Sequence, residues 1–181
     1  MALELSGFEG LTGDQWQSLS IRVLFEEYGA GDLIEVPDHD RGDAGIEAFT
    51  ISGYAFQCYA PEGEPLTNKE RVKRHKVKLD DSVNKFVNNA AKLAAIIPTG
   101  IKIRRYVVLV PLVSSKDVQA HANTLTAEIK AANLPYAADD ICVVVQTLNA
   151  YEGARQAVVA RQLTKLDLPD SGSLNLSLIH I

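Results

Sequence analysis

The fold is decided by residues 42–59, which read Gly-Asp-Ala-Gly-Ile-Glu-Ala-Phe-Thr-Ile-Ser-Gly-Tyr-Ala-Phe-Gln-Cys-Tyr. Residues 46–51 alternate as a half-buried strand does, and residues 54–59 form a second strand-like run. Ser52 and Gly53 between them are typical of a tight turn. The stretch therefore predicts an antiparallel hairpin. Because residues two apart on a strand share a face, Gln57 and Tyr59 are expected to point the same way.

The rest of the chain alternates between helical and strand patterns. Hydrophobic periodicity, helix caps and Gly or Pro stops predict a helix at about 15–28, a strand at 33–36, a polar turn at 38–43, a helix from 67 to about 95, a strand at 105–113, a helix at about 116–132, a strand at 141–146 and a helix at 151–163. The order αβββαβαβα predicts an α/β fold. Its late β-α-β unit implies a parallel crossover packed on an antiparallel meander.

Length and charge bound the function classes. With 181 residues, 46% of them hydrophobic and 23% charged, the chain fits one soluble domain with a proper core. The net charge of −5 argues against a molecule that binds nucleic acid over its whole surface. Any attraction to phosphate must come from a local basic patch.

The two cysteines and the N-terminus predict a cytoplasmic location. Cys58 and Cys142 each lie in an apolar run, where we expect buried, reduced thiols, and no Cys/His cluster has zinc-ligand spacing. Residues 1–10 lack the pattern of a signal peptide. No apolar run approaches the roughly 20 residues that cross a bilayer, so no membrane association is expected.

The C-terminal tail differs in character from the rest. Residues 176–181 resemble translated sequencing adapter, so we expect one domain at 1–168 and a non-native or truncated tail at 169–181. The alternative is a genuine C-terminal strand. A fused or separate partner domain is expected beyond the truncation.

The motif Gly-Asp-x-Gly-Ile-acid, followed ten residues after the acid by Gln-Cys-x, resembles the Mrr-like branch of the PD-(D/E)xK nuclease superfamily. The resemblance covers about residues 11–147 and rests on a short, moderately specific motif. It implies a restriction-endonuclease-like, three-layer αβα core with a mixed sheet. It also implies hydrolysis of DNA phosphodiester bonds with Mg²⁺ or Mn²⁺, because such hydrolysis needs a cation to activate water and neutralise charge.

The resemblance also assigns site residues. Glu47 aligns with the strand acid and Gln57 with the second ligand, while Asp43 is a possible further ligand. Cys58 belongs to the same ligand set through the backbone carbonyl that the strand supplies. Tyr59 takes the position of the family's lysine. Ordinary alternatives remain open: Asp43 in a solvated turn, and Gln57 as a buried, hydrogen-bonded amide.

Two positions depart from the family pattern. Tyr59 carries no positive charge, and Gln17 stands where the first helix has an acid, although Glu26 and Glu27 lie on the same helix. Glu62 is another acid close to the strand end. A lysine that has migrated to the next helix could restore the site, and the candidates are Lys69, Lys73 and Lys76.

The start of the long helix is strongly basic. We expect it to hold a phosphate backbone through Lys69, Arg71, Lys73, Arg74 and Lys76. The alternative is a solvated helix end. The lone histidines, His75 and His121, are expected at the surface.

Two hypotheses follow. The first is a metal-dependent endonuclease module of a prokaryotic restriction or anti-phage protein. The second is an inactive nuclease-fold domain that binds nucleic acid or a protein partner. A homodimer is compatible with either. No phosphate-binding Gly-x-x-x-x-Gly-Lys loop and no Gly-x-Ser-x-Gly nucleophile elbow is present in the sequence.

Overall fold

The computed structural model describes residues 8, 10–37, 44–62 and 66–167. The elements are α1 (Gly13–Tyr28), β1 (Leu33–Glu35), β2 (Ala48–Thr50), β3 (Tyr54–Cys58), α2 (Asn68–Asn88), α3 (Ala90–Ile96), β4 (Ile103–Leu109), α4 (Lys116–Ala131), β5 (Ala137–Gln146), the 3-10 turn η1 (Leu148–Tyr151) and α5 (Glu152–Asp167). The predicted α/β class and the order of the main elements are confirmed.

Some boundaries were predicted wrongly. The long helix does not run unbroken to residue 95, because Asn89, with ψ 30°, separates α2 from α3. The last strand begins at Ala137 rather than at residue 141, because Asp139 and Asp140 are polar and exposed and interrupt the hydrophobic pattern there. The predicted tail at 169–181 and the turn at 38–43 lie outside the described residues.

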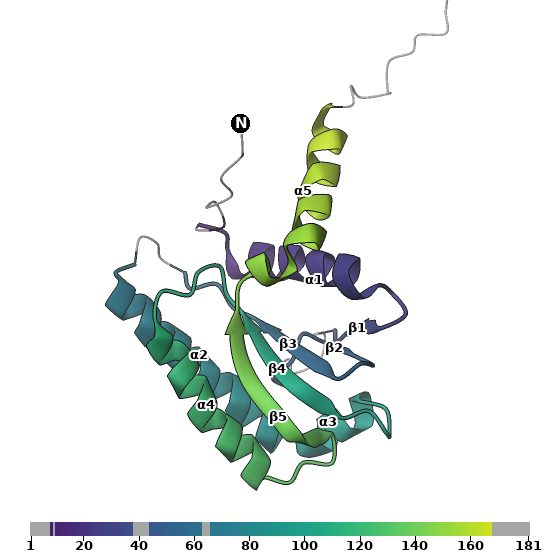
Figure 1. Cartoon of the computed structure of the whole chain (residues 1–181), viewed down its shortest axis with the longest axis vertical. Helices are drawn as coiled ribbons and strands as arrows, with labels where there is room; N and C mark the ends of the chain where they lie inside the picture. The colour runs from purple at the N-terminus through teal and green to yellow at the C-terminus, as the bar shows by residue number, and fades with distance from the viewer. Residues whose placement is uncertain (1–7, 9, 38–43, 63–65, 168–181) are drawn as a thin grey trace, which may run out of the picture.

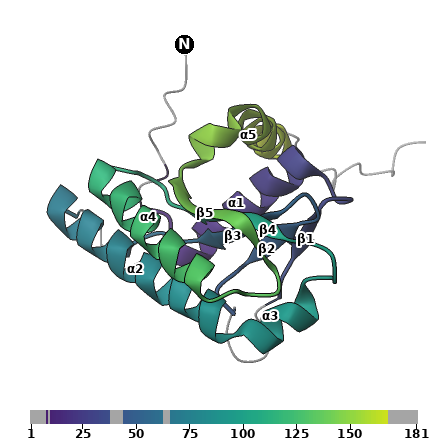
Figure 2. The same ribbon diagram turned by 60° about the horizontal axis from the view of Figure 1, so that its bottom comes forward.

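A five-stranded mixed sheet forms the middle layer, in the order β1-β2-β3-β4-β5. β1, β2 and β3 pair antiparallel, whereas β3, β4 and β5 pair parallel. α2 and α4 lie side by side over one face, and α1 and α5 cover the other (Figures 1 and 2). The expected three-layer αβα core with a mixed sheet is therefore present.

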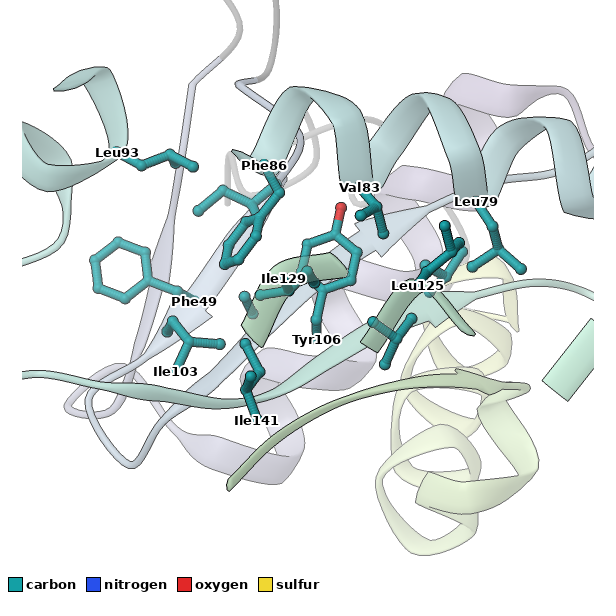
Figure 3. Packing of buried hydrophobic residues seen from close by; sticks show 14 of the residues in the cluster. Phe49, Leu79, Val83, Phe86, Leu93, Ile103, Tyr106, Leu125, Ile129 and Ile141 are labelled. Atoms are coloured by element: carbon teal, nitrogen blue, oxygen red, sulfur yellow. The ribbon is translucent and has the colours of Figure 1, made fainter. Parts of the chain in front are cut away.

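The face toward α2 and α4 holds the larger apolar cluster (Figure 3). Phe86 of α2 packs on Tyr106 of β4, with ring centroids 4.7 Å apart, and on Tyr136. The hydroxyl of Tyr136 donates a hydrogen bond to the carbonyl of Phe86, so this buried polar group is satisfied. These aromatic contacts fix α2 against the sheet.

The opposite face is organised around Trp16 of α1. The side chain is fully buried, and its indole Nε1 donates to the carbonyl oxygen of Leu109 at 3.0 Å. This bond ties α1 to the end of β4 and fixes the position of the next residue, Gln17.

The edge strand β5 is partly protected by α4. The Gln119 side chain donates to the Val143 carbonyl at 3.2 Å and accepts from the Val145 N–H at 3.0 Å. The Thr126 hydroxyl accepts from the Val143 N–H at 2.9 Å. These bonds occupy backbone groups that an exposed edge would offer to another strand.

None of the helices in the described ranges has both the length and the apolar character of a bilayer-crossing segment.

Candidate functional site

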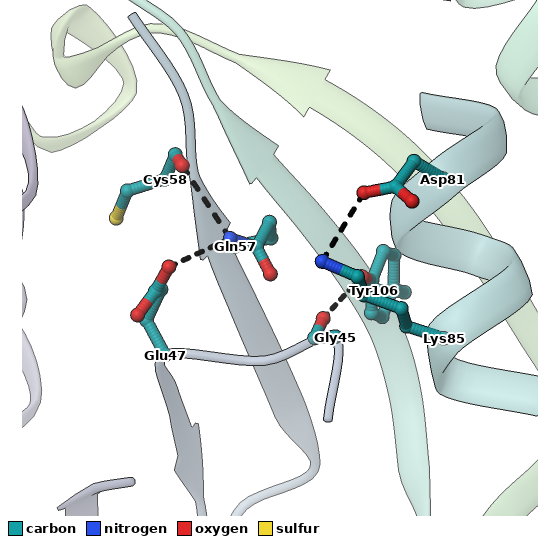
Figure 4. Close-up of polar contacts among 7 residues, drawn as sticks. All are labelled: Gly45, Glu47, Gln57, Cys58, Asp81, Lys85 and Tyr106. Atoms are coloured by element: carbon teal, nitrogen blue, oxygen red, sulfur yellow. Dashed lines mark hydrogen bonds and ion pairs between the residues drawn. The ribbon is translucent and has the colours of Figure 1, made fainter. Parts of the chain in front are cut away.

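Three elements converge on the carboxylate of Glu47, which precedes β2 and is only 6% exposed. Gln57 of β3 donates its Nε2 to Glu47 Oε1 at 2.7 Å (Figure 4). Gln17 of α1 donates its Nε2 to Glu47 Oε2 at 2.8 Å. Each carboxylate oxygen therefore has an amide donor, as a buried charge requires. We call Gln17, Glu47 and Gln57 the Glu47 centre.

The glycine of the Gly-Ile-Glu motif explains how Glu47 is placed. Gly45 has φ 91°, and a Cβ built on it would lie 2.8 Å from both Phe86 N and Ser82 O of α2. The buried hydroxyl of Tyr106 donates to the Gly45 carbonyl (Figure 4). The turn before Glu47 thus lies directly on the α2 backbone, where only glycine fits.

Cys58 contributes a carbonyl rather than a thiol. Burial, and then the charge of Glu47, raises the pKa of the Cys58 thiol, so the sulfur stays protonated at neutral pH. Its carbonyl oxygen lies 3.5 Å from Gln57 Nε2. Cys58 is buried and Cys142 half-buried, and both are free thiols. The expectation that both are fully buried therefore holds only for Cys58.

The carboxylate and carbonyl oxygens at the Glu47 centre are of the kind that ligate a hard divalent cation, although only one group is a carboxylate. Gln57 Oε1 is buried and has no hydrogen-bond partner in the described part of the chain. Turning this amide over would direct the unpartnered oxygen toward Glu47. Within the described ranges, no cluster of three or more His, Cys, Asp and Glu side chains could hold a metal. Asp43 lies outside the described residues.

Tyr59, which the resemblance places where the family has a lysine, has a lysine beside its ring. Lys78 Nζ is 5.8 Å from the centre of the Tyr59 ring. The charge of Lys78 also lowers the pKa of the Cys58 thiol, against the larger effects of burial and Glu47. Lys78 of α2 therefore lies close to the end of β3.

Lys78 was not among the lysines that the sequence analysis offered for this position, which were Lys69, Lys73 and Lys76. Arg71, His75 and Lys78 recur at helical spacing, and the first two are 7% and 2% exposed. The same spacing places Lys78 on the inward-facing side of α2. This periodicity was the signal that could have found it.

The basic residues of α2 divide between two environments. Lys69, Lys73 and Arg74 are exposed and Lys76 is half-buried, which suits contact with a phosphate backbone. Arg71 is buried, so its assignment to an exposed phosphate-binding face is wrong. Its guanidinium hydrogen-bonds the Asn68 side chain at 3.4 Å.

The histidine prediction also needs correction. The helical spacing turns His75 inward, where it is buried and where neither ring nitrogen has a hydrogen-bond partner among the described residues. It lines a small cavity of about 10 Å³ with Arg71. Burial, and then the charge of Arg71, lowers the pKa of His75 to about 4. His121 is partly exposed, with Nε2 2.6 Å from Asp80 Oδ1.

No protein-family model, curated protein or solved structure matches the chain. The resemblance to the nuclease superfamily accordingly rests on the residues quoted above.

Proposed function

We propose that this protein is a metal-dependent DNA endonuclease domain of the kind found in prokaryotic restriction and anti-phage proteins, acting in the cytoplasm. One observation supports this most: side chains from α1, the residue before β2, and β3 meet at one buried carboxylate, within 2.8 Å of its oxygens. A structural carboxylate needs no such convergence, whereas a hydrolytic site needs ligands fixed from several elements.

In the proposed site, Glu47, the amide oxygen of Gln57 and the carbonyl of Cys58 would hold Mg²⁺ or Mn²⁺. When bound, the cation would activate water and neutralise charge at the phosphate. Gln17 keeps the second oxygen of Glu47 in place through its hydrogen bond. Lys78 brings a positive charge to the strand end, where Tyr59 has none.

DNA is held in this proposal by the exposed cations of α2. Lys69, Lys73 and Arg74 project from its first turns, with Lys76 beside them. Such contacts neutralise phosphates without reading sequence, so this surface supports affinity rather than specificity.

The test is nicking of supercoiled plasmid with Mg²⁺ or Mn²⁺. Glu47→Gln keeps the size of the side chain and removes its charge, so it should abolish nicking. Glu128→Gln makes the same change on the exposed face of α4 and should cleave like the wild type. Metal-dependent nicking that survives Glu47→Gln, or no nicking with any divalent metal, would overturn the proposal.

A second candidate is a nuclease-fold domain that binds DNA without cutting it. It is favoured by the amide donors on both oxygens of Glu47, which satisfy the carboxylate without a cation. The same assay separates the two functions, because DNA retention without cleavage under any metal supports only this one.

A further inference from the structure

A groove beside α2 combines aromatic, apolar and charged side chains. The groove measures about 480 Å³ and is lined by Tyr59, Lys73, Arg74, Val77, Lys78 and two acids. We call it the α2 groove. Val77 is 60% exposed, so the groove offers apolar surface between its charged side chains.

The acids of the α2 groove are already engaged, but its lysines are not. Glu70 caps the helix through Thr67, and Asp81 pairs with Lys85 at 3.2 Å. Lys73 and Lys78 have no carboxylate partner among the described residues. The groove therefore presents unneutralised positive charge beside a half-buried aromatic ring and an apolar side chain.

We infer that the α2 groove binds single-stranded DNA, holding an unstacked base against Tyr59 and Val77 and the adjoining phosphates on Lys73 and Lys78. Aromatic rings between cations are the usual means of binding single strands, because every base has a face to stack while the backbone supplies the charge. A duplex hides its base faces, so it could use only the lysines.

The position of Tyr59 links this groove to the Glu47 centre. Tyr59 follows Gln57 by two residues, directly after β3. A base held there would place its strand next to the proposed cation site. The inference rests on the proposed function for its choice of DNA, and it makes the residue at the family's lysine position a specificity determinant.

The test is fluorescence anisotropy with a labelled oligo-dT strand and a labelled hairpin duplex, both in EDTA so that nothing is cleaved. Tyr59→Leu should weaken binding of the single strand roughly tenfold, and Val77→Ser by about threefold because less apolar surface is covered. Duplex binding should change less than about twofold, since phosphate contacts remain. Tyr59→Phe keeps the ring and should bind like the wild type.

Ile51→Ser is the matched control for Val77→Ser, because Ile51 is also an exposed apolar side chain, at 51%. It lies in the turn between β2 and β3 and should change neither affinity. Val77 is exposed, so its variant keeps the test valid even where Tyr59→Leu fails to fold. Equal losses on both DNA forms, or no loss with Val77→Ser, would overturn the inference.

The outcome is separable from that of the proposed function. Single-strand binding that depends on Val77, in a protein that cuts no DNA, removes the endonuclease and leaves the groove. Nicking that depends on Glu47, together with single-strand binding that neither groove variant changes, supports the endonuclease and overturns the inference about the groove.

Discussion

Gln57 of the Glu47 centre and Tyr59 of the α2 groove are two residues apart on the chain, yet the charged groups of the two regions lie in opposite environments. The Glu47 carboxylate is buried and both oxygens accept hydrogen bonds. Lys73 and Lys78 have no carboxylate partner among the described residues. A buried charge must be paired for the protein to fold, whereas a solvated cation need not be. Changes at the centre should therefore cost stability, and changes in the groove should cost binding.

The largest effect is expected at Gly45, which places Glu47. Gly45→Ala introduces a Cβ 2.8 Å from the α2 backbone at a φ of 91°. We expect a loss of about 3 kcal/mol or more in the free energy of unfolding, because neither backbone can move without opening the core. Urea denaturation followed by circular dichroism measures it.

Gly153→Ala is the control for that substitution. Its added Cβ meets no atom within 4 Å, and it lies near the start of α5. Alanine there should leave stability unchanged or raise it slightly. If both variants unfold at the same urea concentration, the Glu47 centre does not depend on the turn at Gly45.

A second expected effect concerns pH and the inner side of α2. His75 is buried with a pKa lowered from 6.5 to about 4. Because the folded protein favours neutral His75, protonation of the unfolded chain below pH 6.5 lowers the free energy of unfolding. Stability is therefore unaffected by His75 above pH 6.5 and falls as the pH drops toward 4. The loss should reach about 3 kcal/mol across that window.

Thermal or urea unfolding of the wild type and His75→Phe between pH 7.5 and pH 4 checks this. The wild type should lose more stability than the variant as the pH falls. Parallel curves for the wild type and His75→Phe would show that His75 is not the titrating group.

The fold was largely predictable, because helical periodicity matches the buried faces of the main helices. Residues 46–51 were predicted as a half-buried strand, whereas residues 46–50 are all buried, because helices cover both faces of the sheet there. The convergence at Glu47 was only half predictable. Gln57 was expected there from the motif, but Gln17 was read as a departure from an acid, although it donates to the same carboxylate. Hydrogen-bond partners thirty residues apart leave no local pattern.

The basic run on α2 shows a second limit. Counting charges put five basic residues on one phosphate-binding face and His75 at the surface, whereas the helix turns Arg71 and His75 into the interior. Helical spacing could have divided them, since positions 71, 75, 78 and 79 share a side. Spacing alone could not predict which lysine contacts another element. Lys78 lies over the Tyr59 ring, whereas Lys73 is exposed.

The smallest effect on stability is expected in the α2 groove, and it sharpens the comparison most. Lys73→Ala combined with Lys78→Ala should change the free energy of unfolding by no more than about 1 kcal/mol, since both amines lack carboxylate partners and Lys78 loses only a ring contact. DNA affinity should fall. The slope of log affinity against log salt should become shallower by about 1.8 for duplex, because binding through two fewer phosphate contacts releases fewer counterions. Lys116→Ala with Lys130→Ala removes the same charge from exposed ends of α4 and should leave the slope unchanged. Salt titrations that shift equally for both double variants would mean that net charge alone, rather than the α2 groove, attracts DNA.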